Sequence, residues 1–346
     1  MNVHTLVRFR NVTISGAILV AAISVVAFTG SNTAHAQTGG SVNSSGATQS
    51  GTGDNLKISP LRSDVTAEPG KTIKKTIYIQ NMNPVPVKLK VINNDFVAGN
   101  KENGEPSIVL DENKFAPTHS LKRFMQPISA ISLKAGERKP IDVTITIPKD
   151  AQAGGYYGAL RFAPVNAEGS GNVNLSGGVA SLILLTVPGN ITEKLTVREF
   201  GVQQNGKYGS RFSTKDNIQA VIRLENRGNV QVAPFGEVFV QKGDKLVYSA
   251  KFNNVTPAGV VLPDSIRKWS VPIEKLDSFG KYKISTTLGY GGNGESITVV
   301  KTIWIFPTAY IFAALIAILV IIGGVALTVV GLKSYKNKIL RNARRR

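Results

Sequence analysis

Apolar and polar residues alternate with a period of two through most of the chain between residues 56 and 302. One such run, 141–147, has Ile or Val at every odd position and Asp or Thr between them. Similar runs occur at 87–91, 218–224, 282–288 and 297–303. Because successive side chains of a β-strand point to opposite faces, this alternation is typical of half-buried strands. No window of this region shows the 3.6-residue repeat of an amphipathic helix, so we predict that it is all-β.

Turn residues divide these strands at the intervals of a β-sandwich, for example at Pro69-Gly70 and Asn205-Gly206. We expect Tyr156–Pro164 and Val179–Val187 to form the last hairpin of a first domain. One pattern recurs: an alternating strand that closes on Asn before a turn, at 77–81 and again at 222–226. The prediction is two tandem immunoglobulin-like β-sandwiches, over residues 56–188 and 189–302.

The N-terminus has the three parts of a secretory signal. Arg8 and Arg10 precede an uncharged, mostly apolar stretch, and Ala34 and Ala36 supply small residues at the −3 and −1 positions of a cleavage site. We therefore predict a signal peptide over residues 1–36, with an uncleaved N-terminal anchor as the alternative. Residues 37–55 are rich in Gly, Ser, Thr and Asn and are expected to form a flexible linker.

The C-terminal region predicts a membrane-spanning helix over residues 303–332. No residue between Lys301 and Lys333 is charged, and 311–330 consists almost entirely of Ile, Leu, Val, Ala and Gly. At 1.5 Å per residue, this stretch is long enough to cross a bilayer core of about 30 Å. Trp304, Tyr310 and Lys333 are expected at the membrane interfaces, and the basic tail, 333–346, in the cytoplasm. A buried core helix is the alternative.

Composition and charge narrow the function. The chain has no cysteine, which excludes disulfides, thiol catalysis and zinc–thiolate sites. Of the net charge of +19, residues 37–332 contribute +10, from 32 basic and 22 acidic residues. This excess favours an anionic wall polymer, or it is only a solvated basic surface. We expect no nucleic-acid partner, because no basic cluster of this region is interleaved with aromatic residues.

Two loops that interrupt the strand pattern are the candidate binding segments: Val97–Pro106 and Asp111–Ile128. Within the second loop, Lys122 and Arg123 beside Phe124 are suited to an anionic glycan or a carboxylate. In the alternative, this segment covers the edge of the sandwich and Phe124 and Met125 close its end. In the second domain we expect Trp269 to pack in the core, with its neighbours Arg267 and Lys268 solvated.

Catalysis is not expected. His119 is the one histidine outside the predicted signal peptide, and no Gly-x-Ser-x-Gly turn accompanies it. The acidic residues show neither a pairing typical of glycosidases nor the spacing of a calcium loop, so we predict no metal and no cofactor.

Several segments resemble the WxL-interacting protein family of bacterial surface proteins. In the first half these are Ile58-Ser59-Pro60, Glu68-Pro69-Gly70-Lys71-Thr72, Leu133-Lys134-Ala135-Gly136-Glu137 and Gly154-Gly155-Tyr156-Tyr157-Gly158-Ala159. In the second half they are Glu225-Asn226-Arg227-Gly228-Asn229-Val230 and Leu262-Pro263-Asp264-Ser265-Ile266-Arg267. The resemblance implies two immunoglobulin-like domains, of which the first is assigned to peptidoglycan and the second to protein partners.

Together these features predict a non-catalytic, single-pass surface protein of the bacterial cell membrane, with its bulk outside. Its expected roles are binding to peptidoglycan or another anionic wall polymer, adhesion and scaffolding, with another surface protein as a further partner. The alternative is an envelope-assembly or chaperone-like module that captures a partner protein by strand addition. A third alternative is a wall-modifying enzyme or its accessory subunit.

Overall fold

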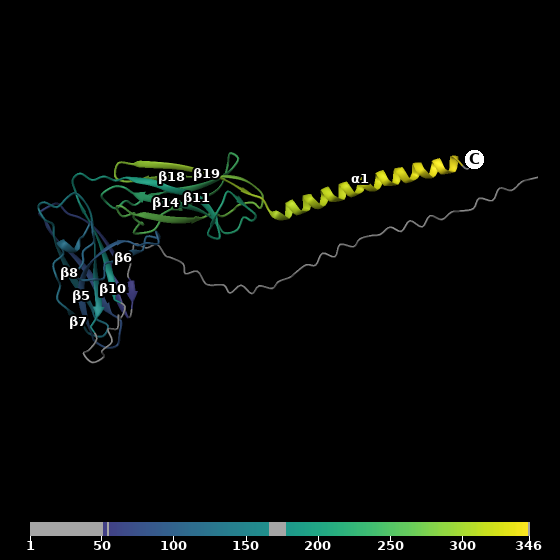
Figure 1. Ribbon diagram of the computed structural model, residues 1–346. Helices are drawn as coiled ribbons and strands as arrows, with labels where there is room; N and C mark the ends of the chain where they lie inside the picture. The colour runs from purple at the N-terminus through teal and green to yellow at the C-terminus, as the bar shows by residue number, and fades with distance from the viewer. Residues whose placement is uncertain (1–50, 54, 166–177, 345–346) are drawn as a thin grey trace, which may run out of the picture. The chain divides into compact units, whose positions relative to one another are not determined.

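The computed structural model describes residues 51–53, 55–165 and 178–344. The predicted signal peptide with Ala34 and Ala36, and the linker up to residue 50, lie outside the described residues. The described chain forms four β-sheets, a short 3-10 helix η1 (Lys122–Phe124) and a long helix α1 (Thr308–Ala343) (Figure 1). The structure is therefore the predicted all-β architecture with one C-terminal helix.

The first sandwich packs a four-stranded sheet, in the order β1-β2-β4-β8, against a six-stranded sheet, in the order β3-β10-β9-β5-β6, with β7 also paired to β5. The first sheet comprises β1 (Gly51–Gly53), β2 (Leu56–Ser59), β4 (Thr72–Asn81) and β8 (Arg138–Thr146). The second comprises β3 (Arg62–Thr66), β5 (Val87–Ala98), β6 (Pro106–Ile108), β7 (Ile131–Leu133), β9 (Gly154–Pro164) and β10 (Val179–Val187). The two inner faces meet in one apolar core.

The second sandwich repeats this plan with two further sheets, in the orders β12-β11-β14-β17 and β13-β19-β18-β15-β16. The first comprises β11 (Leu195–Gln204), β12 (Lys207–Tyr208), β14 (Ile218–Asn226) and β17 (Ile266–Pro272). The second comprises β13 (Arg211–Phe212), β15 (Phe235–Lys242), β16 (Lys245–Phe252), β18 (Gly280–Tyr290) and β19 (Glu295–Ile305). A second core lies between them.

The alternating runs supply both cores. Ile141, Val143 and Ile145 of β8 are buried, while the residues between them are exposed or half-buried. In the second sandwich, the even-numbered residues of β14 and β18 form the buried faces. The predicted hairpin is also confirmed, because β9 and β10 pair antiparallel from Gly154–Val187 to Phe162–Val179. A period of two thus identifies these strands and their inner faces.

The recurring Asn is a structural repeat. Asn81 and Asn226 are both fully buried at the ends of their strands. The Asn81 side-chain amide donates to two backbone carbonyls, at 2.8 and 3.0 Å, and its Oδ1 accepts the N–H of residue 83 at 2.9 Å. The Asn226 amide does the same at 2.7 and 2.8 Å, and its Oδ1 accepts the N–H of residue 228 at 2.8 Å. Each Asn fastens the turn that follows it, which is why the pattern occurs in both sandwiches.

The structure differs from the prediction at two element boundaries. The predicted linker, 37–55, contains β1 at its end, because Gly51–Gly53 pair with Leu56–Ile58 through backbone bonds that need no particular side chain. At the other boundary, the predicted span began at 303, but β19 continues to Ile305, whose side chain is buried in the second core. The helix begins after Pro307, which lacks an N–H and suits a helix start.

Helix α1 is apolar and long enough to cross a membrane. Its 36 residues correspond to about 54 Å at 1.5 Å per residue. This length exceeds the bilayer core, so the basic last turns extend past the apolar segment.

Candidate functional site at the junction of the sandwiches

A loop of the first sandwich, residues 99–105 between β5 and β6, bonds directly to the second sandwich. The Lys268 N–H of strand β17 donates to the Glu102 carbonyl oxygen at 2.6 Å. The Glu102 carboxylate accepts two bonds from the Arg223 guanidinium, at 2.8 and 2.6 Å, and Arg223 also pairs with Glu199 at 3.2 Å. These bonds to Arg223 hold the pKa of Glu102 below its ordinary value of 4.5. One of the two loops predicted to bind a ligand therefore contacts the second sandwich.

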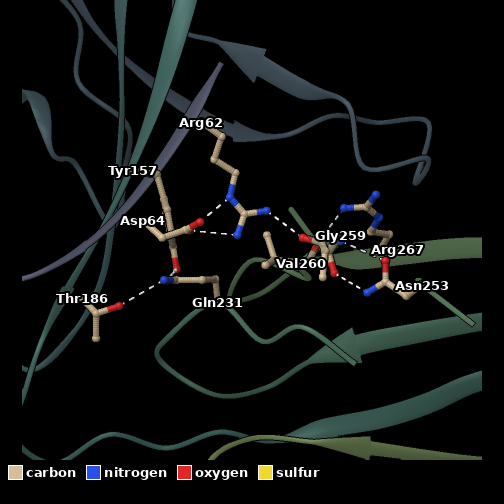
Figure 2. Close-up of polar contacts among 10 residues, drawn as sticks. Arg62, Asp64, Tyr157, Thr186, Gln231, Asn253, Gly259, Val260 and Arg267 are labelled. Carbon is tan, nitrogen blue, oxygen red and sulfur yellow. Dashed lines mark hydrogen bonds and ion pairs between the residues drawn. The ribbon is translucent and has the colours of Figure 1, made fainter. Parts of the chain in front are cut away.

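A polar bridge joins the two sandwiches beside this loop (Figure 2). The buried Tyr157 hydroxyl donates to Gln231 Oε1 at 3.0 Å, and Gln231 Nε2 donates to Thr186 Oγ1 at 3.0 Å. Nearby, the Gly155 N–H donates to the Asn229 carbonyl oxygen at 2.8 Å. Burial raises the pKa of Tyr157, so its hydroxyl stays protonated and serves as a hydrogen-bond donor.

Apolar side chains fill the space between these polar contacts. Val260 and Leu262 of the second sandwich pack against Phe96, Tyr157 and Leu184 of the first. The Phe96 and Tyr157 rings lie 5.8 Å apart, centroid to centroid. The junction thus has a small apolar cluster of its own, to which both sandwiches contribute.

Arg267 of β17 enters this junction without a carboxylate partner among the described residues. Its Nη1 donates to the Val260 carbonyl oxygen at 2.9 Å, and its guanidinium carbon lies 4.9 Å from the Trp269 ring centroid. Nε is buried and has no hydrogen-bond partner in the described part of the chain. The guanidinium lies beside Gly104 and Gly259, and a Cβ on either glycine would collide with it. Burial, and to a lesser degree the charge of Arg62, lower the pKa of Arg267.

Arg62 is the second cation of the junction, and its guanidinium is hydrogen-bonded to a carboxylate and to a backbone carbonyl. Its guanidinium donates to Asp64 Oδ1 at 3.1 and 2.8 Å and to the Ala258 carbonyl oxygen at 2.8 Å (Figure 2). Both arginines line a cavity of about 110 Å³ with mostly apolar walls. The apolar walls include Phe96, Ala98, Pro106, Leu182, Leu184, Val260 and Leu262. The arrangement offers one unpaired guanidinium inside an apolar cleft.

The structure places Lys122 and Arg123 away from this junction, on η1. Lys122 Nζ donates to the backbone oxygens of Glu112 and Lys114 at 2.6 and 2.8 Å. Both cations lie over the Phe115 ring, at 4.8 Å for Lys122 Nζ and 4.4 Å for the Arg123 guanidinium carbon. Arg123 is exposed. The ligand role of these two residues stays a prediction.

Phe124 points away from Lys122 and Arg123 toward the core of its own sandwich. Its ring lies 4.8 Å from that of Tyr156, and Met125 beside it is buried. Phe124 and Met125 therefore pack as the structural alternative expects.

The predicted interface residues lie on two different elements. Trp304 is on strand β19, 45% exposed, with Lys281 Nζ 5.5 Å from its ring centroid. Tyr310 is in the first turn of α1, and Lys333 follows the apolar part of that helix. Their place in a membrane stays a prediction.

Arg267 is not solvated as predicted. Trp269 packs against the second core as expected, and Lys268 is exposed, but Arg267 is half-buried. The signal was available: in β17, Arg267 shares the parity of Trp269 and Val271 and therefore points to the same face. The pairing of Glu102 with Arg223 had no such signal, because it depends on the contact between the two sandwiches.

The His119 side chain makes contacts within the first sandwich. Its Nδ1–H donates to the Gly155 carbonyl oxygen at 2.6 Å, and its ring lies 5.7 Å from the Tyr157 ring. Among the described residues there is no group of three or more His, Cys, Asp or Glu side chains placed to hold a metal ion.

No family model and no curated protein matches the chain. Among solved structures, the class 5 fimbriae chaperone CfaA matches with a TM-score of 0.37 and 14% identity, over 72% of this chain and 99% of that one. The E. coli chaperone DraB matches with a TM-score of 0.33 and 13% identity, over 72% and 98%. The Salmonella enterica SafA pilin–SafB chaperone complex matches with 0.33 and 14%, over 71% and 96%. All three TM-scores are below 0.5. Membership of the WxL-interacting family stays a prediction.

Proposed function

We propose that the protein is a non-catalytic binding module anchored by α1, and that its junction cleft captures a segment of a partner protein. The segment carries a carboxylate beside a small apolar side chain. The observation that carries this proposal is Arg267, a half-buried cation that lines an apolar cleft and has no carboxylate partner among the described residues. This proposal keeps the predicted alternative of a module that captures a partner protein. It differs in the place of capture, which is the junction of the two sandwiches and not the edge of a strand.

Desolvation explains why a carboxylate is the expected occupant. A cation taken out of water loses hydration energy, and it regains that energy only from a partner that is charged or hydrogen-bonded to it. Within the residues that the structure describes, the Arg267 guanidinium forms one hydrogen bond, to a backbone carbonyl. A carboxylate that reached its free N–H groups would bind through the paired geometry that arginine favours.

The size of the cleft limits what accompanies the carboxylate. The cavity of about 110 Å³ is somewhat smaller than the roughly 150 Å³ engineered cavity that binds benzene. One aliphatic side chain is therefore the largest apolar group that we expect inside, with the rest of the segment in solvent.

Trp269 provides a local readout, because it lies against Arg267. In a W304F background it is the only tryptophan. We expect N-acetyl-leucine to change Trp269 fluorescence saturably in the detergent-solubilised full chain, and N-acetyl-leucinamide, which lacks the carboxylate, to bind at least tenfold more weakly. The variant R267M should abolish the difference between the two probes. Equal responses to acid and amide, or an unchanged response in R267M, would refute the proposal.

Cell-wall binding is a second candidate function, and one surface of the first sandwich favours it. On the outer face of the sheet β1-β2-β4-β8, the Arg138 guanidinium carbon lies 4.3 Å from the centroid of the half-exposed Tyr78 ring. Lys57, Ser59 and Gln80 complete a shallow cavity of about 160 Å³ around them. An aromatic ring beside cations and an amide suits a glycan that bears carboxylates, and the resemblance to WxL-interacting proteins points the same way.

Co-sedimentation with isolated peptidoglycan tests this second function. If the Tyr78 surface is the site, Y78A and R138A each reduce saturable binding of the full chain at high salt, and the double change R123A with K122A does not. Binding that disappears for the unchanged chain at high salt would mean that the +10 charge of residues 37–332 acts as a general polycation.

For the membrane topology, we propose a single pass with the sandwiches outside and the basic tail in the cytoplasm. Lys333 and the six basic residues after it support this orientation. Because the chain lacks cysteine, a single Cys introduced at Asn293 or at Asn342 can be labelled selectively in intact cells. We expect an impermeant reagent to label the first position and not the second, and the reverse result would invert the topology.

A further inference from the structure

In the second sandwich, a turn that is held by hydrogen bonds exposes an aromatic ring to solvent. Phe279, in the turn between β17 and β18, is 50% exposed. The turn is fixed from two sides: Lys242 Nζ donates to Asp277 Oδ2 at 2.6 Å and to the Phe279 carbonyl oxygen at 3.2 Å, and the Asp277 N–H donates to the Tyr282 hydroxyl at 2.8 Å. The ring is therefore kept exposed by a fixed backbone.

This ring contacts the start of α1. Its centroid lies 5.3 Å from that of Phe306 and 6.4 Å from that of Tyr310, both in edge-to-face arrangement. Phe306 and Tyr310 are themselves 41% and 58% exposed, and Trp304 on the same end of β19 is 45% exposed. We call these four residues, Phe279, Trp304, Phe306 and Tyr310, the aromatic collar.

The spacing along the chain sets the depth of the collar. Only Phe306 and Pro307 separate the end of β19 at Ile305 from the start of α1 at Thr308. Tyr310 is in the first turn of α1, one residue before the apolar stretch 311–330, or about 1.5 Å along the helix axis. The polar layer on each side of a bilayer core is about 5–8 Å thick. If residues 311–330 cross the core, Tyr310 and the Phe279 ring that lies beside it are in the headgroup layer.

The charges at this end of the sandwich suit an anionic surface. The pairing of Gly280 with Ile305, of Gln241 with Lys283 and of Gln219 with Pro272 brings several turns to the end where α1 begins. The basic residues in and beside these turns are Lys207, Arg211, Lys215, Lys242, Lys245, Lys275 and Lys281. The acidic ones are Asp216, Asp244, Glu274 and Asp277. The excess of Lys and Arg favours anionic headgroups.

We infer that the aromatic collar is a second membrane contact, in which the Phe279 turn rests in the headgroup layer of the bilayer that α1 crosses. This inference rests on the proposed anchoring function of α1. Trp and Tyr are enriched at this depth because their rings combine an apolar body with a polar group, and the Phe279 and Phe306 rings add apolar contact area beside them. Two points of contact, the helix and the turn, fix the tilt of the second sandwich against the membrane, whereas a helix alone leaves the sandwich free to pivot.

Site-specific fluorophores on the full chain test the inference, since the protein has no cysteine of its own. Single Cys residues replace Ser278 beside Phe279, Asn293 in the β18–β19 turn at the opposite end of that hairpin, and Gly323 in the middle of α1. The labelled chains are reconstituted in vesicles of phosphatidylcholine and phosphatidylglycerol that contain lipids spin-labelled near the headgroup or deep in the acyl chain. We expect the headgroup label to quench the fluorophore at 278 at least threefold more than the one at 293.

Matched variants separate a collar contact from mere proximity. The pair F279S and F306S should reduce quenching at 278 to the level at 293, while F235S, which removes a 61% exposed ring at the opposite end of the sheet, should leave it unchanged. A fluorophore at 323 that no deep quencher reaches would refute the anchor itself. Quenching at 323 without quenching at 278, or quenching at 278 that survives F279S with F306S, would refute the collar and leave the anchor standing.

Discussion

Replacing Glu102 with glutamine is expected to loosen the bond between the β5–β6 loop and the second sandwich while keeping the shape of the side chain. The glutamine loses the negative charge that accepts both bonds from Arg223. The Lys268 N–H to Glu102 carbonyl bond is a backbone bond and can form in both proteins. The exchange rate of the Lys268 amide therefore reports how often the loop opens.

The structure sets the size of the effect. A hydrogen bond to a charged group contributes about 1.5–3 kcal/mol, and an exposed ion pair about 0.2–1 kcal/mol. The side chains of Glu102 and Arg223 are 28% and 29% exposed, between these cases, and Arg223 keeps its bond to Glu199. We expect a loss of about 1.4 kcal/mol, which corresponds to about a tenfold faster exchange of the Lys268 amide. The matched control is E105Q, because Glu105 is in the same loop and its carboxylate forms no ion pair with a described residue.

The pH dependence gives this prediction a second test. The folded pKa of Glu102 is lowered by Arg223, so its stabilising effect is fully present above the ordinary value of 4.5 and is lost as the pH falls through the lower folded value. The difference in Lys268 protection between E102Q and the unchanged protein should therefore shrink as the pH falls below 4.5. Equal protection at neutral pH, or a difference that does not change with acid, would refute the role assigned to the pair.

Four further substitutions probe the turns and the cleft. N81A and N226A each leave buried backbone groups without a partner, so urea unfolding should show a loss of about 3 kcal/mol, and a loss below about 1 kcal/mol would contradict the assigned bonds. G104A adds a Cβ where the Arg267 guanidinium lies, on a backbone with φ of +83°, and should weaken binding of N-acetyl-leucine by at least tenfold, as measured by Trp269 fluorescence. S265D places a carboxylate on the cleft wall, so it should raise the unfolding midpoint and abolish binding of the same probe, and tighter binding would show that the cleft does not select for acids.

The sequence predicts features that depend on neighbouring residues and not those that depend on contacts between distant ones. The inner faces of β14 and β18 follow from alternation alone, because a strand with one buried face repeats every second residue. The Asn turns follow from one short pattern found twice. In contrast, nothing near Glu102 indicates that its carboxylate pairs with Arg223 of β14, since the two residues are 121 positions apart in sequence. The start of the C-terminal helix is only partly predictable from the sequence. Ile303 and Ile305 suit a buried strand and a membrane helix equally well, and the pairing of β19 with β18 is what places both residues in a strand.

Comparison of Arg223 with Arg267 supports the proposal that the Arg267 guanidinium, which has no carboxylate partner among the described residues, is part of a binding site. Arg223 and Arg267 are on adjacent strands, and Arg267 pairs with the residue that follows Arg223. Arg223 has two carboxylates, and one of them comes from the loop at 99–105, which also supplies Gly104 beside Arg267. Acidic residues are thus available at the junction, yet the described residues place glycines and aliphatic side chains around Arg267. A purely structural cation at this position would be more stable with a carboxylate, or as an apolar residue of similar size. A site that receives a carboxylate from outside has to leave that position empty, and the lost stability is regained when the ligand binds.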